Sequence, residues 1–74
     1  MPHADTYSCI WEGHAFDVVV YGPGSRAPRY TGRATLSDWS GDGAPPTLHA
    51  EGAQKALVLG KLEAQARFLV DRLP

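Results

Sequence analysis

The feature that most constrains the fold is a helical pattern of apolar residues in the last third of the 74-residue chain. Between Glu51 and Leu73, apolar side chains recur at steps of three and four residues, which places them in one stripe of an α-helix. The stripe consists of Val58, Leu59, Leu62, Ala66, Leu69, Val70 and Leu73. An isolated helix of this length is only marginally stable in water, so the stripe needs an apolar surface to cover it. We therefore predict a helix over about 51–73, packed on a sheet formed by the residues before it.

A second, shorter apolar row lies on the opposite side of the predicted helix. Leu57, Gly60, Ala64 and Phe68 also follow steps of three and four residues. Two interpretations stay open: the row either lies under the loop around Trp39 and completes the core, or it contacts a partner. In the second case the small residues would let another backbone approach closely. A two-fold homodimer of paired helices would then bury the two large side chains.

The first strands are predicted as a β-hairpin. Residues 6–11 and 15–21 are rich in β-branched and aromatic side chains, and Glu12-Gly13 between them suits a two-residue turn. This turn fixes the register, which gives the pairs Tyr7–Val18, Cys9–Phe16 and Trp11–His14. One face then carries the apolar residues Tyr7, Cys9, Trp11, Phe16, Val18 and Val20. Residues 1–5 are polar and aperiodic, so we expect them to be poorly ordered.

A third strand over 29–36 follows the loop of residues 22–28, which is rich in glycine and proline. Its alternation places Tyr30 and Leu36 on the apolar face and arginines and threonines on the solvated face. Gly32 on the apolar face predicts either a close approach of the helix or a bulge. Residues 47–50 have the position of a short fourth strand. The expected fold is one α+β domain, an antiparallel meander of three or four strands packed on a C-terminal α-helix.

The composition excludes several classes of protein. A single cysteine, Cys9, rules out an internal disulfide, and a net charge of −1 argues against a protein whose main role is to cover DNA phosphates. The chain shows neither a signal-peptide pattern nor an apolar run long enough to span a membrane. We therefore expect a cytoplasmic protein.

The residues with metal-binding or nucleophilic chemistry do not form a recognised motif. His3, Cys9, His14 and His49 lack the paired spacing of metal ligands, and Cys9 falls in the middle of an apolar strand face. Gly22–Ser25 lacks the lysine and the following helix of a phosphate-binding loop. We expect no catalytic site, no metal and no cofactor.

The candidate partner-binding residues are three arginines and a tryptophan. Arg26, Arg29 and Arg33 occur within eight residues of one another and follow a stretch without basic residues. They suit either a solvated sheet face, a contact with an acidic protein or a contact with phosphates. Tyr30 alternates to the opposite face, which weakens the nucleic-acid interpretation. Trp39, in a polar loop, either plugs the edge of the core or contacts a partner.

These observations favour a small non-catalytic module that acts by binding a protein partner. Its size and architecture are analogous to those of antitoxin-like proteins and of phage-encoded accessory proteins, including anti-CRISPR-like inhibitors. That analogy extends to small bacterial or phage regulators in general. The alternative function is nucleic-acid binding through Arg26, Arg29 and Arg33.

Overall fold

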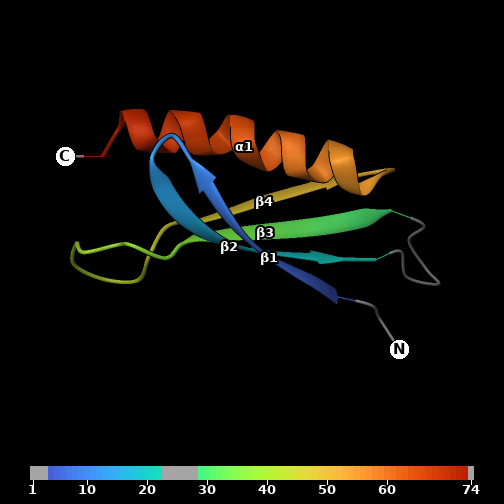
Figure 1. Ribbon diagram of the computed structural model, residues 1–74, viewed down its shortest axis with the longest axis horizontal. Coiled ribbons are helices and arrows are strands. Elements are labelled where there is room, and N and C mark those ends of the chain that lie inside the picture. Colours follow the sequence, from blue (N-terminus) through green and yellow to red (C-terminus); the bar gives the residue numbers. More distant parts are fainter. Residues whose placement is uncertain (1–3, 23–28, 74) are drawn as a thin grey trace.

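The computed structural model describes residues 4–22 and 29–73, which form one antiparallel sheet and one α-helix. The elements are β1 (Ala4–Trp11), β2 (His14–Tyr21), β3 (Tyr30–Leu36), β4 (Thr47–Gly52) and α1 (Lys55–Asp71). Each strand pairs with the next in the chain, so the sheet is a meander of order β1-β2-β3-β4. Helix α1 covers one face and runs along β3 and β4 (Figure 1). The predicted α+β fold is confirmed, and the fourth strand is present.

The hairpin of β1 and β2 has the predicted register. Tyr7 lies opposite Val18 and Cys9 lies opposite Phe16, and the pairing continues without a break along both strands. Glu12 and Gly13 form the turn with φ angles of 51° and 79°. Positive φ at both positions is what a type I′ hairpin turn requires, and this turn matches the twist of the strands that it joins.

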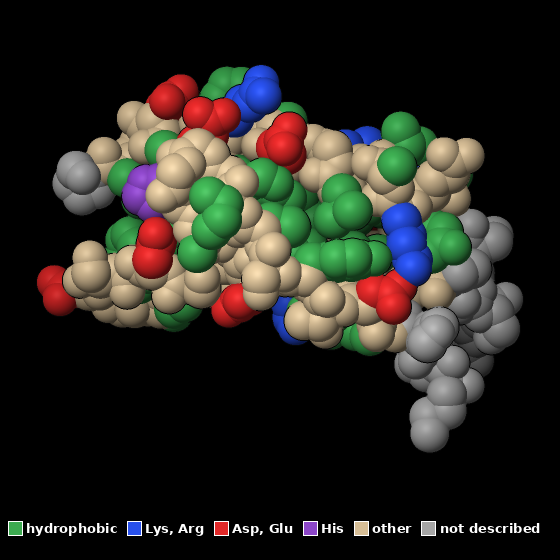
Figure 2. All heavy atoms as spheres, viewed as in Figure 1, with side chains coloured by type: hydrophobic (Ala, Val, Ile, Leu, Met, Phe, Trp, Pro, Cys, Tyr) green, Lys and Arg blue, Asp and Glu red, His purple; other side chains and the backbone are tan. Residues whose placement is uncertain are grey.

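The core lies between the sheet and the predicted stripe of α1. Its buried members are Phe16, Val18, Val20, Ala34, Leu36, Val58, Leu62 and Ala66. The row of β1 on the same face, Tyr7, Cys9 and Trp11, packs against this core but is only half-buried. The reason is the position of α1 over β3 and β4, which leaves apolar side chains visible between α1 and β1 (Figure 2).

Gly32 is the point at which α1 comes closest to the sheet. A Cβ atom at this position would lie 2.4 Å from Cγ1 of Val58 and 3.0 Å from Cδ1 of Leu62. The ladders on both sides of Gly32 are regular, because it pairs with Val20 of β2 and with Ala50 of β4. Of the two explanations for this glycine, the close approach of the helix is confirmed and the bulge is wrong.

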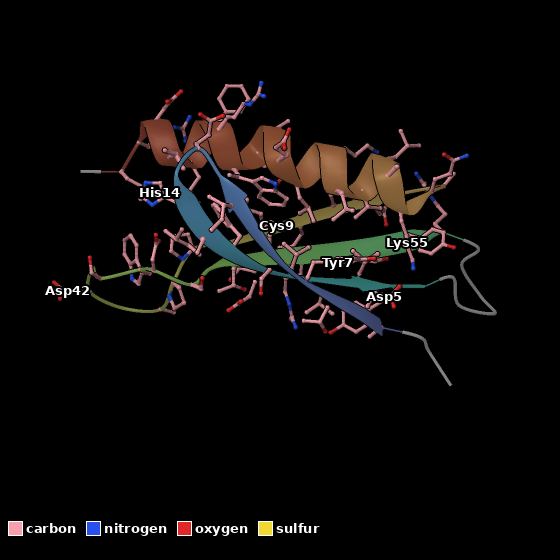
Figure 3. All side chains as sticks on the ribbon, in the orientation of Figure 1. Asp5, Tyr7, Cys9, His14, Asp42 and Lys55 are labelled. Carbon is pink, nitrogen blue, oxygen red and sulfur yellow. The ribbon has the colours of Figure 1, made fainter. Side chains whose placement is uncertain are left out.

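Strand β1 begins earlier in the chain than its predicted start at residue 6. Ala4 and Asp5 belong to β1 rather than to a disordered terminus, and Asp5 forms an ion pair with Lys55 at the start of α1 (Figure 3). The predicted disorder of residues 1–3 lies outside the described residues, as do residues 23–28 of the first loop. The ion pair joins residues that are distant in the chain, so local sequence could not reveal it.

The helix also begins later than its predicted start at 51. Glu51 and Gly52 continue β4, where they pair with Thr31 and Tyr30 of β3. Pairing with β3 satisfies their backbone groups, whereas glycine is a poor helix former. Gln54 precedes the helix in an extended conformation. Within the described residues, no helix is long and apolar enough to cross a membrane.

The close contact at Gly32 yields the first prediction. We expect Gly32→Ala to lower the free energy of unfolding by about 1 to 3 kcal/mol, because the added methyl group overpacks the interface with Val58. In the Gly32→Ala background, Val58→Ala should lower the free energy of unfolding by less than it does in the wild type, since it makes room for that methyl group. Both effects are measured by denaturant unfolding.

Gly60→Ala is the matched control. A Cβ atom at Gly60 meets nothing within 4 Å, so this substitution should leave stability unchanged or raise it by up to about 1 kcal/mol. If Gly32→Ala and Gly60→Ala lowered the free energy of unfolding by the same amount, the proposed overpacking at Gly32 would be contradicted.

Candidate functional site

The second apolar row of α1 is exposed to solvent. Leu57 is 50% exposed and Phe68 is 70% exposed. Gly60 and Ala64, which lie between them, are exposed as well. The interpretation that placed this row in the core beneath the Trp39 loop is therefore wrong. We call the four residues Leu57, Gly60, Ala64 and Phe68 the helix edge.

One flank of α1 is attached to the outer edge of β4. Lys61 donates a hydrogen bond from Nζ to the backbone oxygen of Glu51 at 2.7 Å, and Gln65 donates from Nε2 to the backbone oxygen of His49 at 2.8 Å. These carbonyls point away from β3, so they would otherwise form an open sheet edge. The two side chains hold the helix and cover that edge at the same time.

The other flank of α1 reaches the turn between β1 and β2. Nε of Arg67 lies 3.1 Å from Oε1 of Glu12, and Nη2 of Arg67 lies 3.9 Å from Oε2 of Glu63. These pairs are solvent-exposed, so each contributes at most about 1 kcal/mol. Together with the buried stripe, the two flanks occupy three sides of the helix. The helix edge lies on the fourth side and faces away from the sheet.

The predicted arginine patch is only partly defined. Arg33 is exposed on the face of the sheet that α1 does not cover, between Val19 of β2 and His49 of β4. Arg29 is exposed and directly precedes β3, and Arg26 lies outside the described residues. Nη2 of Arg33 lies 3.5 Å from the hydroxyl oxygen of Tyr21, an aromatic residue on the same face that the sequence analysis did not single out.

Trp39 is packed against the core, as the plug interpretation predicts. It lines a cavity of about 320 Å³ together with Leu36, Leu73 and residues of its own loop. The indole Nε1 is buried and has no hydrogen-bond partner among the described residues. Trp39 therefore lies on the helix side of the sheet, whereas Arg33 lies on the open side. The structure does not bring these predicted partner-binding residues together.

An additional polar pair lines this cavity. Nδ1 of His14 lies 3.4 Å from Oδ1 of Asp38, and the backbone N–H of Ala15 donates to Oδ2 of Asp38 at 3.4 Å. Asp38 thereby ties the loop after β3 to the start of β2. The sequence offered no signal for this pair, because 24 residues separate its members.

Cys9 does not have the environment of a nucleophile. Burial of the thiol, together with the negative charge of Glu63, raises the pKa of Cys9 above its ordinary value. The thiol therefore stays protonated at neutral pH, whereas a nucleophilic cysteine needs the thiolate. Within residues 4–22 and 29–73, no group of three or more His, Cys, Asp or Glu side chains is placed to hold a metal ion.

Comparisons of the chain with protein-family models, with curated proteins and with solved structures give no match.

Trp39 provides a test of the plug interpretation. We expect Trp39→Ala to lower the free energy of unfolding by about 2 to 4 kcal/mol, because it opens a space at the end of the core. Trp39→Phe should cost less, since the phenyl ring keeps most apolar contacts and removes the unpartnered N–H group. Denaturant unfolding measures both changes. A loss below about 0.5 kcal/mol for Trp39→Ala, the size of an ordinary surface substitution, would show that the indole is not part of the core.

Proposed function

We propose that the protein is a small non-catalytic module that binds a protein partner through the helix edge. The observation that carries this proposal is the exposure of Leu57 and Phe68. The other three sides of the helix contact the face of the sheet, the β4 edge and the β1–β2 turn. A chain of this size has little core, so two large apolar side chains left in water are a cost that a partner surface would remove.

The spacing of the helix edge indicates the kind of surface that it fits. Leu57 and Phe68 are eleven residues apart in α1, which corresponds to about 16 Å along the helix axis. Gly60 and Ala64 between them would allow close approach of the partner's backbone. An apolar groove that accepts one helix face at two anchor positions has the matching shape. In this mode the sheet serves as the support that keeps α1 helical.

The biological role that suits this geometry is that of an inhibitor or regulator that covers a functional surface of its partner. Antitoxin-like and anti-CRISPR-like proteins of phages and mobile elements act in this general way, and the small α+β architecture is compatible with it. The analogy concerns size and architecture, and it supports the role without identifying the partner.

The proposal predicts that capture of the partner depends on the apolar character of position 68. Tagged wild-type protein and Phe68→Leu should retain the same protein from the native cell, whereas Phe68→Glu and Leu57→Glu should lose it. The leucine variant is the matched control, because it keeps an apolar anchor at the same position. Circular dichroism should show that all variants are folded, since both side chains lie outside the buried stripe.

Charge reversal on the open face separates the helix edge from the arginines. Arg29→Glu combined with Arg33→Glu should leave capture unchanged. Loss of capture in this variant, with retention in Phe68→Glu, would move the partner surface to the open face and overturn the proposal for the helix edge.

A second candidate function is nucleic-acid binding on the open face. It is favoured by the contact between Arg33 and Tyr21, because an arginine beside an exposed aromatic ring can bind a phosphate next to a stacked base. Arg29 would add a second positive charge. The nearby carboxylates of Asp17 and Glu51, which belong to the same face, weaken this candidate.

This candidate predicts a defined salt dependence. If Arg29 and Arg33 each neutralise one phosphate, the logarithm of the duplex-DNA binding constant should fall with the logarithm of salt concentration with a slope near −1.8. Arg29→Glu with Arg33→Glu should abolish the binding. Fluorescence anisotropy with single- and double-stranded oligonucleotides measures both, and absence of binding at about 50 mM salt would exclude the candidate.

A further inference from the structure

The two edges of the sheet differ in how their backbone groups are covered. At the β4 edge, Lys61 and Gln65 bind the outward carbonyls of Glu51 and His49. The opposite edge is β1, whose one neighbour among the described strands is β2. Natural proteins usually protect such an edge, because unpaired N–H and C=O groups are a template for another strand.

The pairing pattern identifies the outward groups of β1. Trp11 and His14 flank a two-residue turn, so they form a hydrogen-bonded pair, and such pairs alternate along an antiparallel ladder. Thr6, Ser8 and Ile10 consequently direct their backbone groups away from β2. The N–H of Ser37 supports this assignment, because it donates to the oxygen of Ala15 at 2.9 Å on the β3 side, and Ala15 is the β2 residue opposite Ile10.

Several of the usual protective features are absent from the described residues of β1. Ala4–Trp11 contains no proline, lysine or arginine, and all eight of its residues pair with β2 without a bulge. Its one charged side chain, Asp5, forms an ion pair with Lys55 of α1. Within residues 4–22 and 29–73, no hydrogen bond involves the backbone of Thr6, Ser8 or Ile10 outside the β1–β2 ladder.

Apolar side chains lie beside this edge on both faces of the sheet. Ile10 is 71% exposed on the open face. Tyr7, Cys9 and Trp11 are only half-buried on the helix side, and Tyr7 and Cys9 lie along β1 in Figure 3. The apolar band between α1 and β1 in Figure 2 includes this region. A strand added to β1 would therefore gain side-chain contacts on both faces as well as backbone hydrogen bonds.

We propose that the β1 edge pairs with β1 of a second copy of this chain, antiparallel about a two-fold axis at Ser8. Around this axis Thr6 lies opposite Ile10 of the second copy, Ser8 lies opposite Ser8, and Ile10 lies opposite Thr6. Each of these three pairs exchanges two hydrogen bonds, which makes six in total. On the helix side, Tyr7 of each copy lies opposite Cys9 of the other. Both of these pairs bring two apolar side chains together.

Charge and shape favour a second copy as the occupant. Lys55 neutralises Asp5 within each chain, so the two neutral strands approach without like-charge repulsion. Helix α1 packs mainly on β4 and β3 and makes few contacts with β1. The product is a continuous eight-stranded sheet with both helices on one face, and it leaves the helix edge free. The inference is therefore independent of the proposed function.

The first test is the mass of the wild-type protein together with amide exchange. Light scattering should give a two-chain mass, and the thermal midpoint should rise with concentration between about 1 µM and 1 mM. The amides of Thr6, Ser8 and Ile10 should be protected from hydrogen exchange at high concentration, although they face solvent in a single chain. A one-chain mass throughout, or a two-chain mass with these amides unprotected, would overturn the proposal.

The second test uses proline at matched positions of the two edges. Ser8→Pro removes an outward N–H and no bond of the β1–β2 ladder, so the chain should fold and its dimer dissociation constant should rise by at least about 30-fold. His49→Pro makes the same change on β4, where the outward carbonyl binds Gln65, and should remain dimeric. Retention of the dimer by Ser8→Pro would overturn the proposal.

A third variant keeps the test decisive if Ser8→Pro does not fold. The double variant Thr6→Lys with Ile10→Lys places like charges opposite each other across the two-fold axis, and both positions are exposed in the single chain. It should be a folded monomer by circular dichroism and light scattering. A folded dimer of this variant would contradict pairing through β1.

Discussion

The contact between Gly32 and Val58 sets the distance between α1 and the sheet, and most of the other features depend on it. Without a side chain at Gly32, the helix lies close over β3 and its stripe reaches the buried residues of β2. In this position Lys61 reaches the outer carbonyls of β4 and Arg67 reaches the β1–β2 turn. Because α1 lies in this position, the helix edge faces solvent and β1 forms the edge of the sheet that the helix does not cover.

Much of this fold could be predicted because its signals are local. The Glu12-Gly13 turn and the alternation of β1 and β2 determine one register, since a shift by one residue would move every apolar side chain to the wrong face. The buried stripe of α1 followed from helical periodicity alone. The start of α1 did not, because pairing of Glu51 and Gly52 with β3 overrides a helical pattern that continues up to the strand. Such competition is decided by tertiary contacts, which a local pattern does not contain.

The candidate site was predictable to a smaller extent. Periodicity identified the helix edge but left its exposure open, since exposure depends on where the Trp39 loop packs. Arg33 and Trp39 were both candidate partner-binding residues, yet the strand pleat and the loop after β3 place them on opposite sides of the sheet. The side chains that cover the β4 edge, and the pair of His14 with Asp38, join residues from distant elements. No motif marks such contacts before the fold is known.

The docking of α1 on the sheet has a consequence for folding of the chain. Until α1 docks, Phe16, Val18 and Leu36 have no helix to cover them. The β4 edge is then as open as the β1 edge, because Lys61 and Gln65 both belong to α1. A nascent sheet with an apolar face and two open edges is prone to aggregate. Docking of α1 is therefore the folding step that closes both the apolar face and the β4 edge, and a variant that slows this step should be the one most prone to aggregate.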